Sequence, residues 1–162
     1  MTAKAKTELK DKTRVLAQIK QELVSLPLIK DLCAELGYPL SIIHGIPLDF
    51  EELDVSAKTV DSKVYLNEDL LSEPFEIIMR YAVHEVTHAL QHMNREHLDH
   101  DPYADDDYLD REDELAAFQN QIEYQKSAEG EDATREYVEE LVDYHDLKDK
   151  DREEKIDELL NG

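Results

Sequence analysis

The sequence has a single cysteine, no tryptophan, and no apolar run long enough to cross a bilayer. Because two thiols are needed for a disulfide, Cys33 alone excludes an internal disulfide framework and fits a reducing compartment. A membrane-spanning helix needs about 18 consecutive apolar residues, and the stretch from Met1 to Arg14 lacks the apolar centre of a signal peptide. We therefore expect a cytoplasmic protein that neither crosses nor enters a membrane.

Basic residues are also scarce. Lysine and arginine number 18 against 40 aspartates and glutamates, which gives a formal net charge of -22. Such a charge repels phosphates and anionic lipids, so it excludes direct binding to nucleic acids or to membrane surfaces. It leaves two kinds of protein open, one whose partners are basic and one that imitates the charge of DNA and inhibits a nucleic-acid enzyme.

The length and composition predict one folded domain. The chain has 162 residues, of which 41% are hydrophobic, and this suits a single core. We assign residues 1–162 to one domain with a core over about residues 8–146. Residues 147–162 are highly charged and are expected to be a tail or a solvated helix.

The first half of the chain changes from helical to strand-like patterns. Leucines and isoleucines from Leu9 to Leu26 recur at helical spacing, and a second helix is predicted from Pro27 to Leu36, with Gly37 as its left-handed cap. Three short segments rich in β-branched and aromatic residues follow, over 38–47, 52–60 and 62–67. They predict about three strands, with His44 as a structural histidine in the first of them. Cys33 is expected in the core.

Helical spacing returns after Pro74. The apolar stripe of this helix consists of Phe75, Ile78, Ala82, Val86, Ala89 and Met93. A strongly acidic segment then reads as a loop, and helical patterns resume over 114–126 and, after a break at 128–132, around 137–142. The whole pattern predicts an α+β fold with N-terminal helices, a small sheet and then helices.

The stripe helix contains the sequence "HEVTH", from His84 to His88. On an α-helix, residues four apart lie about 40° apart around the axis, so both imidazoles can reach one metal ion. Glu85 lies about 100° further round, where it cannot ligate the ion but can hold a water bound to it. The pattern therefore predicts a zinc site with Glu85 as general base.

A catalytic zinc site needs a third protein ligand. His92 lies about 12 Å along the same helix from His84, too far to share the ion. His97 or His100 can reach back only if the helix ends before Arg95.

The segment "DREDELAAF" offers carboxylates at the start of another helix instead. Glu114 follows His88 by 26 residues (114 − 88), enough for a loop and a return, and small apolar residues follow it. We favour Glu114 as the third ligand, with Glu112 as the alternative.

These motifs resemble those of the zincin metallopeptidases, and the downstream glutamate resembles the gluzincin branch. Within that branch the chain is similar, over roughly Ser62 to Gln125, to small single-domain metallopeptidase-like proteins of bacteria and phages. The resemblance implies one Zn²⁺ ion bound by His84, His88 and Glu114. It also implies an exposed edge strand before the metal helix that binds substrate backbone, and residues 62–67 match that position.

The sequence departs from the family at Phe118, where larger gluzincins often carry an acidic residue that orients a ligand. A carboxylate or backbone carbonyl elsewhere is then expected to orient His84 or His88. No tyrosine or histidine can be selected as an oxyanion stabiliser.

The function expected from these residues is zinc-dependent hydrolysis of internal peptide bonds in a peptide or protein, with a preference for basic segments. The alternatives are a zinc-binding protein without turnover and the acidic DNA mimic.

The acidic segment from Asp99 to Glu114 holds nine carboxylates in sixteen residues. It lacks the spaced Asp, Asn and Gly pattern of a calcium loop. We therefore expect a solvated acidic lid here and no calcium site.

Overall fold

The computed structural model describes residues 3–93, 112–145 and 147–161, with side chains from residue 12 in the first helix and from residue 114 after the long gap. The chain forms two compact units, Met1–Asp99 and His100–Gly162. The assignment of residues 1–162 to one functional domain stays a prediction. The acidic segment up to residue 111, with His97 and His100, lies outside the described residues.

The first unit begins with three helices, α1 (Ala3–Ser25), α2 (Pro27–Leu36) and α3 (Ile42–Gly45). Pro27 lies in the first turn of α2, where its missing N–H costs no hydrogen bond. Gly37 ends the helix with φ of +80°, and its N–H donates to the carbonyl of Ala34. The predicted bounds and cap of α2 are thus confirmed, and Cys33 is buried as expected.

The strand predicted over residues 38–47 is wrong. The structure has turns and the short helix α3 there, and His44 is exposed near the end of that helix. The apolar pair Ile42 and Ile43 suggested a strand, but only Ile43 is buried. The four residues of α3 are too few for the sequence pattern to separate one helical turn from a strand.

The sheet is mixed and has three strands, β1 (Leu48–Glu51), β2 (Ala57–Val60) and β3 (Lys63–Asn67), in the order β1-β3-β2. β1 pairs with β3 in parallel, and β2 pairs with β3 antiparallel. The number of strands agrees with the prediction. Residues 62–67 do not form an edge strand, however, because β3 is central and the edges are β1 and β2. Sequence order placed β3 last, but the parallel β1–β3 pairing puts it in the middle.

A two-residue turn joins β2 to β3. Asp61 and Ser62 have φ of +50° and +66°, and Val60 pairs with Lys63 across the turn. Positive φ at both central residues is the backbone of a type I′ turn, whose twist matches that of the adjoining strands. This short connection fixes the register of β2 on β3.

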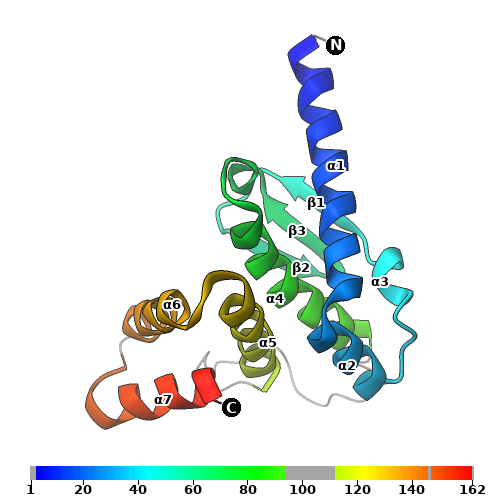
Figure 1. Cartoon of the computed structure of the whole chain (residues 1–162). Helices are drawn as coiled ribbons and strands as arrows, with labels where there is room; N and C mark the ends of the chain where they lie inside the picture. Colours follow the sequence, from blue (N-terminus) through cyan, green and yellow to red (C-terminus); the bar gives the residue numbers. More distant parts are fainter. Residues whose placement is uncertain (1–2, 94–111, 146, 162) are drawn as a thin grey trace. The chain divides into compact units, whose positions relative to one another are not determined.

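Helix α4 (Phe75–Met93) lies against the sheet and contacts β2 and β3 (Figure 1). It follows the short 3-10 helix η1 (Glu68–Ser72) and Pro74. Of the predicted stripe, Ile78, Ala82, Val86 and Ala89 are buried, whereas Met93 is 38% exposed. On the sheet face towards α4, Phe50, Val64 and Leu66 are buried, and the core continues into the first two helices through Ile19, Leu23, Ile29 and Cys33. A packed sheet thus backs the helix that carries "HEVTH".

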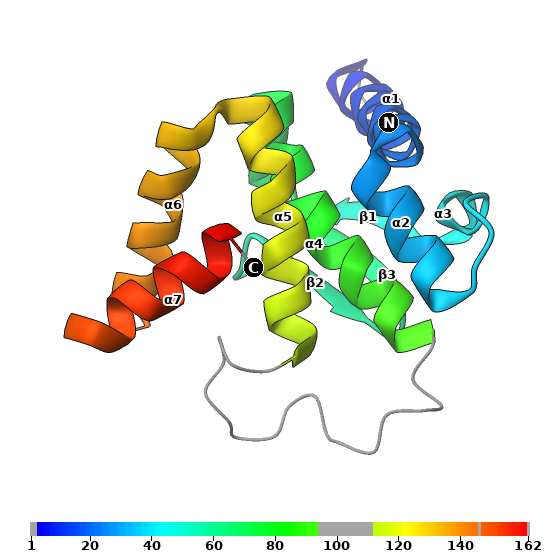
Figure 2. The same ribbon diagram turned by 60° about the horizontal axis from the view of Figure 1, so that its bottom comes forward.

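The second unit consists of α5 (Glu112–Glu129), α6 (Glu131–Tyr144) and α7 (Asp149–Asn161), which contact one another (Figure 2). Gly130, with φ of +91°, separates α5 from α6, as the break at 128–132 predicted. The core of this unit consists of Phe118, Ile122, Val138, Val142, Ile156 and Leu159. The charged end of the chain is therefore a helix with one buried face.

No helix among the described residues is long and apolar enough to span a membrane.

The α+β class is confirmed. N-terminal helices precede a three-stranded mixed sheet, and the histidine helix α4 is followed by α5, which bears Glu114.

Candidate metal centre

Two imidazoles lie together on α4. The ring centroids of His84 and His88 are 5.0 Å apart, as expected for residues four apart on a helix. Both side chains are buried, with 6% and 8% of their surface exposed. Buried imidazoles side by side on a helix are suited to binding an ion that replaces their water.

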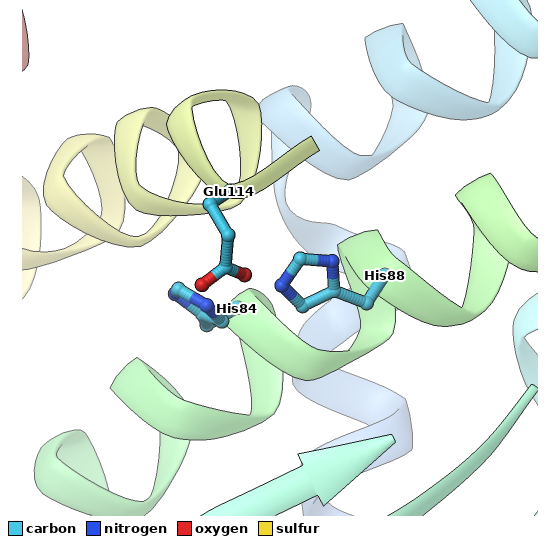
Figure 3. Close-up of side chains that lie close together, drawn as sticks. All are labelled: His84, His88 and Glu114. Atoms are coloured by element: carbon cyan, nitrogen blue, oxygen red, sulfur yellow. The ribbon is translucent and has the colours of Figure 1, made fainter. Parts of the chain in front are cut away.

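Glu114 supplies the third group. It lies in the first turn of α5, where the N-terminal end of the helix dipole favours a carboxylate, and only 3% of it is exposed. One ligand atom each from His84, His88 and Glu114 lies within 4.8 Å of the others, and Figure 3 shows the carboxylate directed at the two rings. The structure therefore brings the predicted ligands together into a group that can hold one metal ion.

The other candidate ligands are His92, Glu112, His97 and His100. His92 is one turn further along α4, with its ring centroid 6.4 Å from that of His88, and it is not part of the group formed by the described residues. The side chain of Glu112 lies outside the described residues, as do His97 and His100. Among the residues whose side chains are described, Glu114 is the carboxylate that meets the two histidines.

Gln91 orients one of the rings. The Oε1 atom of Gln91 lies 2.9 Å from Nδ1 of His88. Because an amide oxygen only accepts, Nδ1 carries the proton and Nε2 is left to bind a metal. The sequence predicts a carboxylate or backbone carbonyl in this role for His84 or His88. For His88 the structure has a side-chain amide instead, and its spacing of three residues from His88 on one helix is a signal that could have revealed it.

Glu85 lies beside the two ligands and is held by the sheet. The hydroxyl of Thr59 on β2 donates to Oε2 of Glu85 over 2.6 Å and lies 3.0 Å from the backbone oxygen of the same residue. Glu85 is half-buried, so it retains access to solvent. Sequence spacing missed Thr59, because 26 residues separate the pair and only the packing of β2 on α4 joins them.

A hollow of about 420 Å³ lies within the first unit beside the N-terminal half of α4. Tyr81, four residues before Glu85 on the helix, is part of its wall, and so are Asp69, Glu73 and Arg80. The remaining lining residues are Ser56, Asn67, Leu70 and Ile77. The hollow is mainly polar and carries both signs of charge.

Two buried imidazoles and a buried carboxylate, with a second carboxylate next to one ligand in sequence, form a set consistent with a zincin-like site. Comparisons of this chain with protein-family models, with curated proteins and with solved structures found no match.

Proposed function

We propose that this protein is a zinc-dependent peptidase that hydrolyses internal peptide bonds. The observation that carries the proposal is the convergence of His84, His88 and Glu114, which come from two helices and present ligand atoms within 4.8 Å of one another. The carboxylate of Glu85 stands beside this group, held at one oxygen by Thr59.

The donor set fits zinc better than it fits magnesium or calcium. Imidazole nitrogen suits zinc, whereas magnesium and calcium prefer sites made of oxygen ligands. Three protein ligands leave a fourth tetrahedral position open, as in catalytic rather than structural sites. The near-complete burial of all three side chains favours binding, because a buried carboxylate is stabilised by a cation.

The roles of the residues follow from this arrangement. Zinc in such a site supplies Lewis acidity, which lowers the pKa of a water molecule and polarises a carbonyl. His84, His88 and Glu114 would hold the ion, and Gln91 would keep the ring of His88 in the required tautomer. Glu85 would take the proton of the attacking water and later pass it to the leaving amine, as a general base and then an acid.

The substrate would be a peptide or an unfolded protein segment. The resemblance to zincins implies that its backbone pairs with an edge strand, and β2 is an edge strand that packs against α4. The net charge of -22 favours basic segments by attraction over long range. The finer resemblance, to gluzincins and to small bacterial and phage metallopeptidase-like proteins, supports the same activity.

The test is hydrolysis by the zinc-loaded full chain. A library of peptides derived from a proteome is incubated in ¹⁸O-labelled water, and new labelled C-termini are identified by mass spectrometry. Glu85→Gln removes the base while keeping the side-chain shape, so turnover should fall by about 10²–10⁴ while bound zinc stays unchanged. Glu76→Gln, at an exposed position on the same helix, is the control for loss of one negative charge.

The alternatives give different results. A zinc-binding protein without turnover would retain metal but yield no labelled termini in any peptide. The charge of -22 favours the acidic DNA mimic. Such a protein would inhibit a nucleic-acid enzyme equally well with Glu85→Gln, and its inhibition would weaken as salt is added. Unchanged hydrolysis in Glu85→Gln would exclude the proposed mechanism.

A further inference from the structure

A single threonine connects the sheet to the carboxylate beside the metal centre. Thr59 is in β2, and its hydroxyl donates to Oε2 of Glu85 over 2.6 Å. The same hydroxyl lies 3.0 Å from the backbone oxygen of Glu85, which already belongs to the helical hydrogen-bond ladder of α4. The shorter contact, to a charged oxygen, is the stronger of the two.

The surroundings of Thr59 make this hydroxyl unusual. Alternation along the strands places Thr59 on the sheet face towards α4. The other side chains of that face are Leu48, Phe50, Ala57, Val64 and Leu66. Valine has nearly the shape of threonine, favours strands equally and loses no hydrogen bond to water on burial. Thr59 is half-buried on this largely apolar face, and the acceptor of its hydroxyl there is Glu85.

The backbone around Thr59 is fixed as well. Thr59 pairs with Val64 in the antiparallel β2–β3 ladder, and the two-residue turn at Asp61 and Ser62 sets that register. A slip of one residue would turn Thr59 to the opposite face of the sheet. The hydroxyl is therefore held at one place relative to α4 by the strand pairing.

We propose that Thr59 is a positioning residue for the general base, and this inference rests on the proposed function. Its hydroxyl holds Oε2 of Glu85 and so leaves Oε1 to accept the proton of the attacking water. Thr59 transfers no proton itself and keeps its own throughout. A glutamate side chain has three rotatable bonds, and fixing one carboxylate oxygen removes orientations that cannot reach the water.

The first test uses three variants of the zinc-loaded full chain and one peptide chosen from those that the wild type cleaves. Thr59→Val removes the hydroxyl at nearly constant volume, and we expect kcat to fall at least tenfold while KM stays within twofold. Thr59→Ser keeps the hydroxyl and should restore most of kcat. Val55→Thr, in the loop before β2 at a position 48% exposed, makes the reverse substitution away from the proposed binding strand and should change neither constant.

A role through Glu85 predicts that the two substitutions do not add. In the Glu85→Gln background, Thr59→Val should leave the residual rate unchanged, because the base that it positions is gone. Zinc content should equal that of the wild type in every variant. A merely structural role would instead lower the rate in both backgrounds or reduce the bound zinc, and either result would overturn the proposal.

A second measurement tests the contact without turnover. In the metal-free protein, Thr59→Val should lower the urea midpoint in the wild-type background and lower it less in the Glu85→Ala background. Additive shifts would mean that the two side chains do not interact in solution, and this would overturn the proposal.

The kinetic outcomes separate this inference from the proposed function. An active wild type with a fully active Thr59→Val variant would overturn the role of Thr59 alone. A zinc-loaded wild type that cleaves no peptide would overturn the proposed function and this role with it.

Discussion

The two units of the chain contribute unequally to the candidate site. The first unit contains His84, His88 and Glu85, together with Gln91 and Thr59, which contact His88 and Glu85. The second unit is a three-helix assembly that supplies one carboxylate, Glu114. The proposed general base and the residue proposed to position it therefore both belong to the sheet-backed unit.

The units also differ in how they are held together. Several helices and a sheet share the core of the first unit, and a left-handed cap and a type I′ turn fix its connections. The second unit has a buried cluster of six residues, with acidic helix faces around it and an arginine–aspartate pair between α6 and α7. The effects of substitutions on stability should therefore differ between the two units in size and in their dependence on pH.

Removal of zinc should have the largest effect on stability. An ion bound at 1,000 times its Kd stabilises the folded chain by about 4 kcal/mol, so a chelator should lower the melting temperature clearly at neutral pH. Acid protonates free imidazoles and displaces the ion, so the difference should shrink towards zero near pH 5. Equal melting temperatures at neutral pH, in protein shown to contain zinc, would mean that the metal adds no net stability.

A cavity in the second unit should have the second-largest effect on stability. Ile122→Ala removes most of a side chain that is 1% exposed in the six-residue cluster, and we expect a loss of about 2–4 kcal/mol in the free energy of unfolding. Glu123→Ala, at the adjacent exposed position, should change it by less than about 0.5 kcal/mol. Urea denaturation measures both, and a similar small loss for the two variants would show that this cluster is not packed.

Relief of backbone strain in the β2–β3 turn should have a smaller effect of opposite sign. Ser62 has φ of +66°, a region that glycine adopts without steric cost. We expect Ser62→Gly to stabilise the protein by up to about 1 kcal/mol, as measured by urea denaturation. Ser56→Gly, at a position outside the positive-φ region, should give no gain, and a gain of the same size there would contradict the explanation.

The smallest effect is expected at the α6–α7 ion pair. Arg152 donates to Asp143 over 2.7 Å, and this hydrogen bond holds the pKa of Asp143 below its usual value. A carboxyl whose pKa is lower in the folded state stabilises the fold above its unfolded pKa, about 3.9, and this contribution is lost as the pH falls through the folded pKa.

Asp143→Asn should accordingly lower the melting temperature slightly at pH 7. The difference from wild type should begin to shrink as the pH falls below about 4 and should vanish below the lowered pKa of the folded state. Both groups are partly exposed, so salt should weaken the effect. Glu140→Gln, at an exposed position on the same helix, is the charge control. A difference that grows in acid would contradict the assigned direction.

Local signals predicted much of the fold and most of the candidate site. Pro27, Gly37 and the apolar spacing after Pro74 act within a few residues, so the bounds of α2 and the start of α4 could be read directly. The pairing of His84 with His88 likewise follows from one helical turn. The sequence predicts Glu114 as the third ligand because a catalytic zinc site needs one and the next helix begins with carboxylates.

Long-range pairing could not be predicted in the same way. The central position of β3 depends on a parallel pairing with β1, and no local pattern encodes strand order. In the sequence, Thr59 has the pattern of an ordinary strand residue. Its contact with Glu85 is found only in the folded structure, where β2 packs against α4. The helix α3 is a single turn, too short for periodicity to identify.

The most direct test of the central claim is the zinc content of the purified full chain and four variants, measured by mass spectrometry of the metal after dialysis. The account predicts one zinc per chain in the wild type and in Glu85→Gln, and much less in His84→Ala, His88→Ala and Glu114→Ala. A wild type without zinc after zinc loading, or full zinc in Glu114→Ala, would contradict the three-ligand site.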